Sequence, residues 1–413
     1  MSGIYIHIPF CKSKCAYCNF FSLASEKKID EYIVALKKEI VARNQYLGDE
    51  KVRTIYFGGG TPSLLKTNHI EEILTLLHKN FDIIPNPEIT LELNPDTIDK
   101  EKMTSLKKIG VNRMSVGIQS FHDDDLKYLG RQHNSRHALQ VIDDLNSVGF
   151  DKLTLDLIYG MPTLTEEKWN KNLDIFFSTG ISHLSAYALT VEPKTILGQK
   201  IGKGILQDVD EDVTVRHYEI LVQRTKEHDF EHYEISNFAR QGCRSQHNSI
   251  YWNDVKYLGL GPSAHSYDGN SRQWNVANLT QYIQLVKVAE RQEVSGLYER
   301  ELLTKDDKFN EYVMTSLRTS WGCDINKIAS DYGISYANHF LKNVKRYVES
   351  GIMINNNDNY IVDLEEFGEK YVDAHLPLRD HFYFLCKSCH KLYDATPQKL
   401  TDIEIKKKIK PLP

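Results

Sequence analysis

The chain has 413 residues, 41% of them hydrophobic and 26% charged, which is the balance of a soluble globular protein with two or three domains or one large barrel. Its 51 Lys and Arg against 56 Asp and Glu give a formal net charge of −5, which argues against a dedicated nucleic-acid binder. There is no run of about 20 apolar residues, no signal-peptide pattern at the start and only seven cysteines, so we expect a cytoplasmic protein with neither a membrane span nor a secreted disulfide scaffold.

The first predicted strand, Tyr5–Ile8, leads into the cysteine-rich segment CKSKCAYC. Cys11, Cys15 and Cys18 have the spacing C-x3-C-x2-C, and no fourth cysteine follows nearby. Clustered thiols in a reducing cytosol are more often metal ligands or catalytic groups than disulfides. A structural zinc ion would need a distant fourth ligand. On a [4Fe–4S] cluster, three thiolates would leave one iron open to another ligand.

Further β-rich segments follow, separated by stretches with helical periodicity such as Ile29–Val41 and Ile70–His78. These segments are Thr54–Phe57, Ile89–Leu93, Arg113–Ile118, Lys152–Ile158 and His183–Leu189. Strands that alternate with helices indicate parallel βαβ units. Six such units fit an incomplete barrel better than a closed eight-fold one. The fold class expected for residues 1–235 is therefore α/β, a partial (β/α)6 TIM-like barrel.

The pattern changes after about residue 200. The segment EHYEISNF, residues 231–238, is interpreted as one further strand, and residues 236–300 as a linking region that holds HNSIYWN and GLGPSAHSY. Residues 301–372 have helical patterning and end in a hairpin-like segment, GIMINNNDNYIV, which predicts a C-terminal helical, winged-helix-like accessory domain. Residues 373–413 form a basic tail of unknown role.

Polar and glycine-rich residues follow several of the predicted strands. They are Gly58–Pro62 (GGGTP), Glu92–Pro95 (ELNP), Gln119 with Ser120, and Asp156. Because βα barrels carry their chemistry at the C-terminal ends of the strands, these residues are expected to meet in one site.

With these features in hand, the chain resembles the radical S-adenosylmethionine superfamily. More closely, it resembles the group that contains oxygen-independent coproporphyrinogen III dehydrogenases and HemW-type haem chaperones. The resemblance runs from residue 4 to about residue 365. It rests on the ordered segments YIHIPFC, FGGGTP, ELNP, GIQSF, LGRQH, DLIYGMP and LGLGPSAHS.

The resemblance implies that Cys11, Cys15 and Cys18 bind three irons of a [4Fe–4S] cluster, whose fourth iron is chelated by S-adenosylmethionine. The residues that it places around this cofactor are Tyr5, Tyr17, Gly59, Gly60, Thr61, Glu92, Gln119, Arg131, Asp156 and Thr190. A guanidinium fork matches a carboxylate, and glycine lets the backbone approach a ligand closely. Family members that turn over cleave the cofactor to a 5′-deoxyadenosyl radical, so an electron donor would be a further partner.

Two features separate the two branches of this group. The dehydrogenases carry a further cysteine two residues after the third one, where this chain has Phe20. His247, Tyr251 and Trp252 belong to HNSIYW, which matches the HNxxYW signature of the chaperones. Imidazole is a common haem ligand, and the two aromatic rings offer flat faces for a porphyrin. A packed structural histidine is the alternative for His247.

Other cysteines are weaker candidates. Cys243, four residues before His247, is a conceivable second haem ligand. Cys386, Cys389 and His390 form a C-x-x-C-H string, the pattern of covalent c-type haem attachment. That attachment needs an export system, so a small metal or redox site and incidental cysteines are the alternatives. His265 faces the cofactor cavity or is a packed residue.

The sequence therefore predicts a cytoplasmic haem chaperone that binds haem as cargo and transfers it to an apo haem-protein, with a respiratory haem enzyme as the expected acceptor. The alternative is an enzyme, an oxygen-independent coproporphyrinogen III dehydrogenase, so the sequence leaves open whether the protein is an enzyme. A third class, a zinc-stabilised binding module, would contain zinc and no iron.

Overall fold

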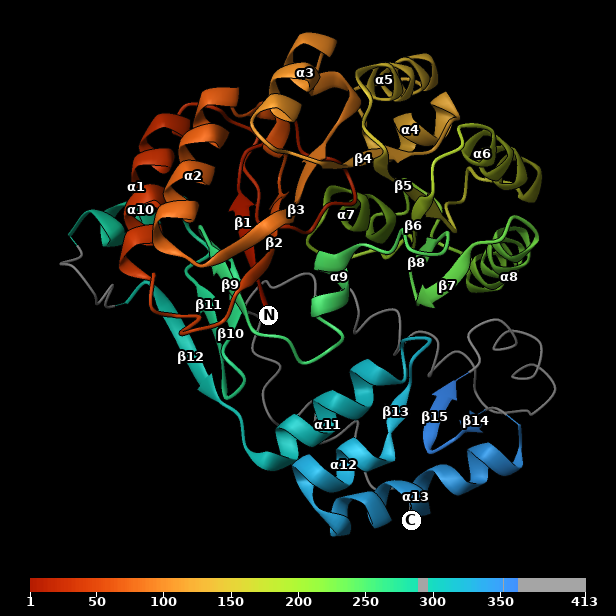
Figure 1. Ribbon diagram of the computed structural model, residues 1–413. Coiled ribbons are helices and arrows are strands. Elements are labelled where there is room, and N and C mark those ends of the chain that lie inside the picture. The colour runs from red at the N-terminus through yellow and green to blue at the C-terminus, as the bar shows by residue number, and fades with distance from the viewer. Residues whose placement is uncertain (289–295, 352, 363–413) are drawn as a thin grey trace.

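The computed structural model describes residues 1–288, 296–351 and 353–362. Within these ranges the chain forms a twelve-stranded sheet and a separate three-stranded sheet. The large sheet curves into an arc, with helices along its outer side and the C-terminal elements on its inner side (Figure 1). None of the helices in these ranges has the length and apolar character needed to cross a membrane.

Six parallel strands form the centre of the large sheet. They are β1 (Ser2–Ile8), β2 (Val52–Gly59), β3 (Ile83–Leu93), β4 (Arg113–Gln119), β5 (Lys152–Tyr159) and β6 (His183–Ala188). Each pairs in parallel with the next one along the chain. The helices between and after them are α1 (Ile29–Ala42), α2 (Thr67–Asn80), α3 (Lys100–Lys108), α4 (Asp123–Leu129), α5 (Ser135–Val148), α6 (Glu166–Ser178), α7 (Ile196–Gly202) and α8 (Glu211–Glu227). The predicted partial α/β barrel is thus confirmed.

Alternation along the parallel strands separates an apolar face from a polar one. Ile4, Ile6 and Ile8 of β1 are 0% exposed and belong to the main core beneath the outer helices. Tyr5 and His7 lie on the opposite face because successive side chains of a strand point to opposite sides. The same inner face carries Thr54, Tyr56, Glu88, Glu92, Arg113, Ser115, Thr154 and Asp156. The inner face is therefore polar, whereas the outer face packs into the core beneath the helices.

Residues 236–300, expected as a linking region, contribute strands to the same sheet. The additional strands are β7 (Glu231–Glu234), β8 (Asn237–Ala239), β9 (Tyr257–Leu260), β10 (His265–Tyr267), β11 (Ser271–Asn275) and β12 (Tyr298–Leu302), with helices α9 (Gln246–Ile250) and α10 (Leu279–Val288). The sheet order is β12-β11-β10-β9-β1-β2-β3-β4-β5-β6-β8-β7. The single strand expected over residues 231–238 is in fact the antiparallel pair β7 and β8, because the chain reverses between them.

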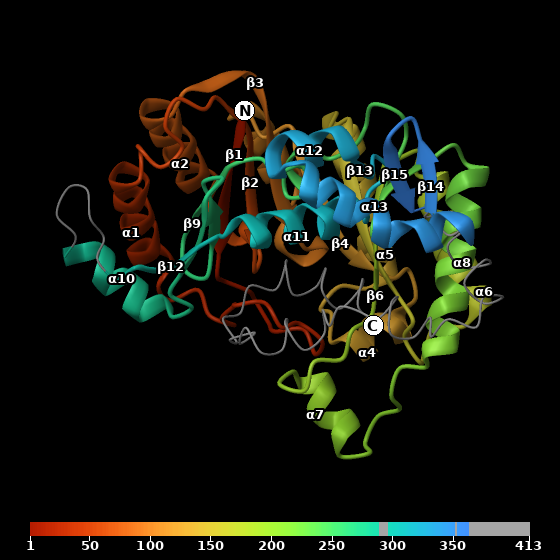
Figure 2. The same ribbon diagram turned by 90° about the horizontal axis from the view of Figure 1, so that it is seen from below.

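The C-terminal unit contains the expected helices and hairpin. Its elements are α11 (Lys305–Ser316), β13 (Cys323–Asp324), α12 (Ile325–Tyr332), α13 (Ile334–Glu349), β14 (Met353–Asn356) and β15 (Asn359–Val362). It has its own core around Phe309, Ile328 and Phe340. Seen from below, the unit lies across the inner side of the sheet (Figure 2). The basic tail, with Cys386, Cys389 and His390, lies outside the described residues.

Candidate functional site

The three clustered cysteines lie on a loop that follows β1. Cys11, Cys15 and Cys18 are each partly exposed. Neighbouring segments hold the loop by backbone hydrogen bonds, from Cys11 N to Leu23 O at 2.9 Å and from Ala16 N to Leu129 O at 2.9 Å. The thiols therefore project from a fixed loop at the C-terminal edge of the parallel strands.

Two polar side chains contact these sulfur atoms. Thr61 Oγ1 donates to Cys11 Sγ at 3.5 Å, and Arg131 Nη1 donates to Cys15 Sγ at 3.4 Å. Burial raises the pKa of Cys18 to about 12. Among the described residues, no group of three His, Cys, Asp or Glu side chains gathers around a single metal-ion position. The donor set is three thiols beside one guanidinium, which suits a multi-iron centre whose irons each take one thiolate.

The GGGTP turn is shaped first by the chain itself. A Cβ atom on Gly59 would lie 2.5 Å from the His7 ring, and one on Gly60 would lie 2.6 Å from the Phe10 carbonyl oxygen. Gly59 also has a φ of 106°, in the region that favours glycine. Thr61 N donates to Phe10 O at 2.7 Å. The small size of these glycines is thus required to seat the turn against the start of the cysteine loop, and their predicted contact with a ligand stays a prediction.

Two carboxyl groups with raised pKa values lie on the inner face of the sheet. Burial raises the pKa of Glu92 to about 7, although Tyr56 Oη donates to Oε1 at 2.8 Å and Gly59 N to Oε2 at 3.1 Å. Burial and the charge of Glu92 raise the pKa of Asp156 to about 7, and Ser115 Oγ donates to its Oδ1 at 3.2 Å. Perturbed carboxyls of this kind cluster at functional sites.

Arg131 ties the cysteine loop to the ends of two strands. Besides Cys15, its guanidinium donates to Asn94 Oδ1 and to Gly117 O, both at 2.6 Å. Gln119, at the end of β4, has a φ of 72°. A Cβ on Gly117 would lie 3.0 Å from the Gln119 amide. The predicted cofactor residues Arg131 and Gln119 are thus brought together.

Two other predicted residues, Tyr17 and Tyr5, fall in the same region. The charges of Arg131, Cys15 and Asp156 act on the Tyr17 hydroxyl, which places Tyr17 among them. Tyr5 Oη is hydrogen-bonded to His7 Nδ1 at 3.1 Å. Thr190 is partly exposed in the loop after β6.

His247 lies deeper in the barrel than the sequence indicated. It is 1% exposed on α9, its Nδ1 is bonded to Thr54 Oγ1 at 2.7 Å, and its Nε2 to Tyr251 Oη at 3.0 Å. Burial lowers its pKa to about 3, so the ring is neutral. Trp252 is 4% exposed. HNxxYW therefore packs into the inner side of the sheet and does not present three side chains on one open surface.

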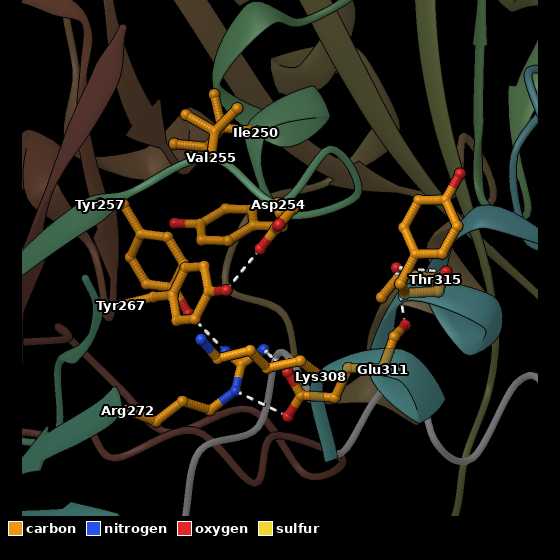
Figure 3. A pocket seen from close by; sticks show the side chains of 11 residues that line it. Ile250, Asp254, Val255, Tyr257, Tyr267, Arg272, Lys308, Glu311 and Thr315 are labelled. Atoms are coloured by element: carbon orange, nitrogen blue, oxygen red, sulfur yellow. Dashed lines mark hydrogen bonds and ion pairs between the residues drawn. The ribbon is translucent and has the colours of Figure 1, made fainter. Parts of the chain in front are cut away.

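A pocket separates this segment from the C-terminal unit. Figure 3 shows Tyr257, Tyr267 and Arg272 from the sheet facing Lys308 and Glu311 of α11. Ile250 and Tyr251 also line the pocket, whose volume including space open to solvent is about 380 Å³. Arg272 joins the two sides by donating to both carboxylate oxygens of Glu311, at 3.0 and 2.7 Å.

Comparison with known proteins identifies the family. A model of the radical SAM superfamily matches residues 5–175. The haem chaperone HemW of Bacillus subtilis is 33% identical over 86% of this chain and 93% of its own length, and that of Lactococcus lactis is 31% identical over 86% and 91%. The chain belongs to the HemW family.

A solved structure agrees with the fold of this HemW-family chain. Coproporphyrinogen III oxidase (HemN) from Escherichia coli superposes with a TM-score of 0.77 at 24% sequence identity, covering 90% of this chain and 88% of that one. At this level of identity the likeness establishes the fold alone. Phe20, the position expected to distinguish the two branches, is partly exposed beside the cysteine loop, and its backbone forms a hydrogen bond with Cys18.

Sequence reasoning missed several residues that hold the site together. They are Thr54, Tyr56, Ser115 and Gly117. The period-two alternation within the strands was the available signal, because it places these residues on the same face as Tyr5, Glu92 and Asp156.

Proposed function

We propose that this HemW-family chain is a haem chaperone that binds haem and transfers it to an apo haem-protein. The observation that carries the proposal is the 33% identity to the B. subtilis chaperone over 93% of that protein's length. The HNxxYW segment supports it, because His247, Tyr251 and Trp252 match the signature of the chaperones.

The cysteine loop and the polar inner face fit a [4Fe–4S] cluster with S-adenosylmethionine. Cys11, Cys15 and Cys18 would hold the cluster, and Glu92 and Asp156 would accept hydrogen bonds from the cofactor. When bound, the pair supplies one-electron chemistry at the cofactor sulfonium. Arg131 anchors Cys15 and would face the cofactor carboxylate, so the chain's own part is to orient the cofactor and limit water access.

Haem is proposed to bind at the segment of His247, Tyr251 and Trp252. For His247 Nε2 to bind iron, it must exchange its hydrogen bond to Tyr251 for the iron bond. The acceptor would be an apo haem-protein, with a respiratory haem enzyme as the candidate, and an electron donor is needed only if the cofactor is cleaved.

The alternative function is oxidative decarboxylation of coproporphyrinogen III. The fold is compatible with it, since the HemN structure superposes on this chain. Phe20 disfavours it, because the sequence lacks the further cysteine of that branch. Similarity to several HemW chaperones over most of the chain also favours the carrier.

The test is a haem titration of anaerobically reconstituted protein, followed by Soret absorbance. We expect saturation near one haem per chain, weaker binding by the His247→Ala variant, and transfer of the bound haem to apomyoglobin. Tyr360→Phe serves as a matched control, because it removes the hydroxyl of a buried tyrosine, bonded to Asn355 Nδ2 at 3.2 Å, in the small sheet of the C-terminal unit. Absence of specific haem binding together with coproporphyrinogen turnover would establish the enzyme instead.

A further inference from the structure

The side chain of His247 forms part of the wall of the expected cofactor cavity. Its ring stacks on the Tyr56 ring, with centroids 4.9 Å apart and planes inclined by 23°. It lies 6.4 Å from the Tyr5 ring at a similar inclination of 27°. Tyr5 and Tyr56 themselves stack at 6.1 Å. Three planar rings from β1, β2 and α9 thus pack against one another inside the barrel as one ring cluster.

This ring cluster reaches the carboxylate of Glu92, which we assign as a ligand of the cofactor. Tyr56 Oη donates to Glu92 Oε1 at 2.8 Å. His247 is fixed on its other sides by Thr54 at Nδ1, by Tyr251 at Nε2, and by the bond from its backbone N–H to Glu88 Oε1 at 3.0 Å. A clamped imidazole therefore supports the ring whose hydroxyl orients Glu92.

We propose that Tyr56 is a positioning residue for S-adenosylmethionine, acting through Glu92, and that His247 of HNxxYW holds Tyr56 in place. The inference rests on the proposed function, because it takes Glu92 as a cofactor ligand. It gives HNxxYW a second role, in building the cofactor site, whether or not His247 also binds iron.

The Tyr56 hydroxyl acts on Glu92 in two ways. It fixes the carboxyl group together with Gly59 N–H, and it favours the ionised form. Three other titratable groups face Glu92, namely Tyr5, Tyr251 and Asp156. Burial and the negative charge of Glu92 raise the pKa of each of them. Without the hydroxyl, Glu92 is ionised at a higher pH and is held by the Gly59 N–H alone. The cationic cofactor then loses an oriented anionic acceptor.

The first experiment measures the Kd of S-adenosylmethionine by calorimetry on the anaerobically reconstituted protein between pH 6 and 8.5. Tyr56→Phe keeps the ring and removes the hydroxyl. We expect its Kd at pH 7 to be about tenfold higher, as for loss of a hydrogen bond to a charged group. The pH at which affinity rises should also move upward. A Tyr56→Phe variant with wild-type affinity and an unshifted pH profile would overturn the proposal.

The second experiment compares two substitutions of His247. His247→Ala removes the support for Tyr56 and is expected to raise the Kd of S-adenosylmethionine several-fold. His247→Phe restores a planar ring and is expected to recover most of that affinity. Because both changes act through Glu92, adding Tyr56→Phe to His247→Ala should cost little more than Tyr56→Phe alone. Full additivity, or equal cofactor affinity in both His247 variants, would contradict this arrangement.

The Tyr360→Phe variant controls for loss of the hydroxyl of a buried tyrosine and is expected to bind S-adenosylmethionine like the wild type. Iron content and folded fraction are measured for every variant, so that a folding defect is recognised. If the wild type itself fails to bind S-adenosylmethionine, the cofactor assignment of the proposed function fails. If the wild type binds and the variants match it, only the positioning role fails.

Discussion

At the scale of single residues, Arg131 concentrates three contacts in one guanidinium. It donates to Asn94, to Gly117 O and to Cys15 Sγ, which a lysine ammonium cannot reproduce in the same planar geometry. We therefore expect Arg131→Lys to lose iron to a chelator several-fold faster than the wild type, followed by the decay of visible absorbance. Arg136→Lys, an exposed substitution on α5, is the matched control. Equal rates for both variants would show that charge alone suffices at position 131.

Glu92 gives a prediction for the dependence of stability on pH. Its pKa is about 7 in the fold and about 4.3 in an unfolded chain, so the folded state binds more protons between these values. Stability contributed at this position therefore falls as pH rises from about 4.3 to about 7. Glu92→Gln removes this titration. The stability of the variant relative to the wild type should therefore be about 1–2 kcal/mol higher at pH 8 than at pH 5.5. Urea unfolding of the cluster-free protein at both pH values measures the difference, and equal differences would contradict it.

At single residues, the sequence grouped the three cysteines and Arg131 in one site, and the structure shows their positions, whereas their binding roles stay predictions. The three cysteines do lie on one loop, and Arg131 does reach it. The depth of His247 was not predictable, because it depends on a hydrogen bond to Thr54, which is 193 positions away in the chain. No local pattern encodes such a contact.

At the scale of elements, the buried pair Glu39 and Arg43 joins α1 to the strands added beside β1. Arg43 Nη2 donates to Gln273 Oε1 at 2.7 Å, and Glu39 accepts from Gly261 N at 2.8 Å and from Tyr282 Oη at 2.7 Å. The Arg43 side chain is only 5% exposed, and the Glu39 side chain is 0% exposed. These contacts hold β9 and β11 in place, although both strands are short.

Removing one member of this pair should be costly. Arg43→Met leaves the Glu39 carboxylate buried without its cation, and such a change costs about 3–5 kcal/mol. The double variant Glu39→Gln with Arg43→Met removes both charges and should recover part of the loss. Denaturant unfolding of the wild type, the two single variants and the double variant tests this. A double variant as unstable as the sum of the two single ones would show that the two charges act independently.

The same contacts explain why the β9–β12 extension was not predicted. The six parallel strands carry strong apolar patterns, and their alternation with helices predicts a partial barrel. The added strands include the polar segments SRQWN and YEREL, which have no pattern typical of a sheet. The position of β11 depends on the tertiary hydrogen bond from Arg43 to Gln273, and that of β12 on its pairing with β11, so residues 236–300 resembled a linking region.

At the scale of the whole molecule, a chain of side chains connects the expected cofactor site to the C-terminal unit. It runs from Glu92 and Tyr56 to His247 and Tyr251, whose ring lies edge-on to Tyr257 at 4.9 Å. Tyr257 accepts a hydrogen bond from Arg272 at 3.1 Å, and Arg272 binds Glu311 of α11. HNxxYW stands in the middle of this chain. We therefore expect a ligand that moves HNxxYW to affect both Glu92 and the contact between Arg272 and Glu311.

We accordingly expect haem and S-adenosylmethionine to affect each other's binding. If His247 exchanges its bond to Tyr251 for haem iron, its ring shifts relative to Tyr56, and Glu92 is no longer held as before. Binding free energies are reciprocal, so the factor by which haem changes the Kd of S-adenosylmethionine must equal the factor for the reverse. We expect about a fivefold change or more, the lower range of typical couplings. Calorimetric titrations in both orders measure it. Tyr56→Phe should reduce the coupling, because it disconnects Glu92 from the ring cluster. If the two ligands bind independently in the wild type, the ring cluster does not transmit haem binding.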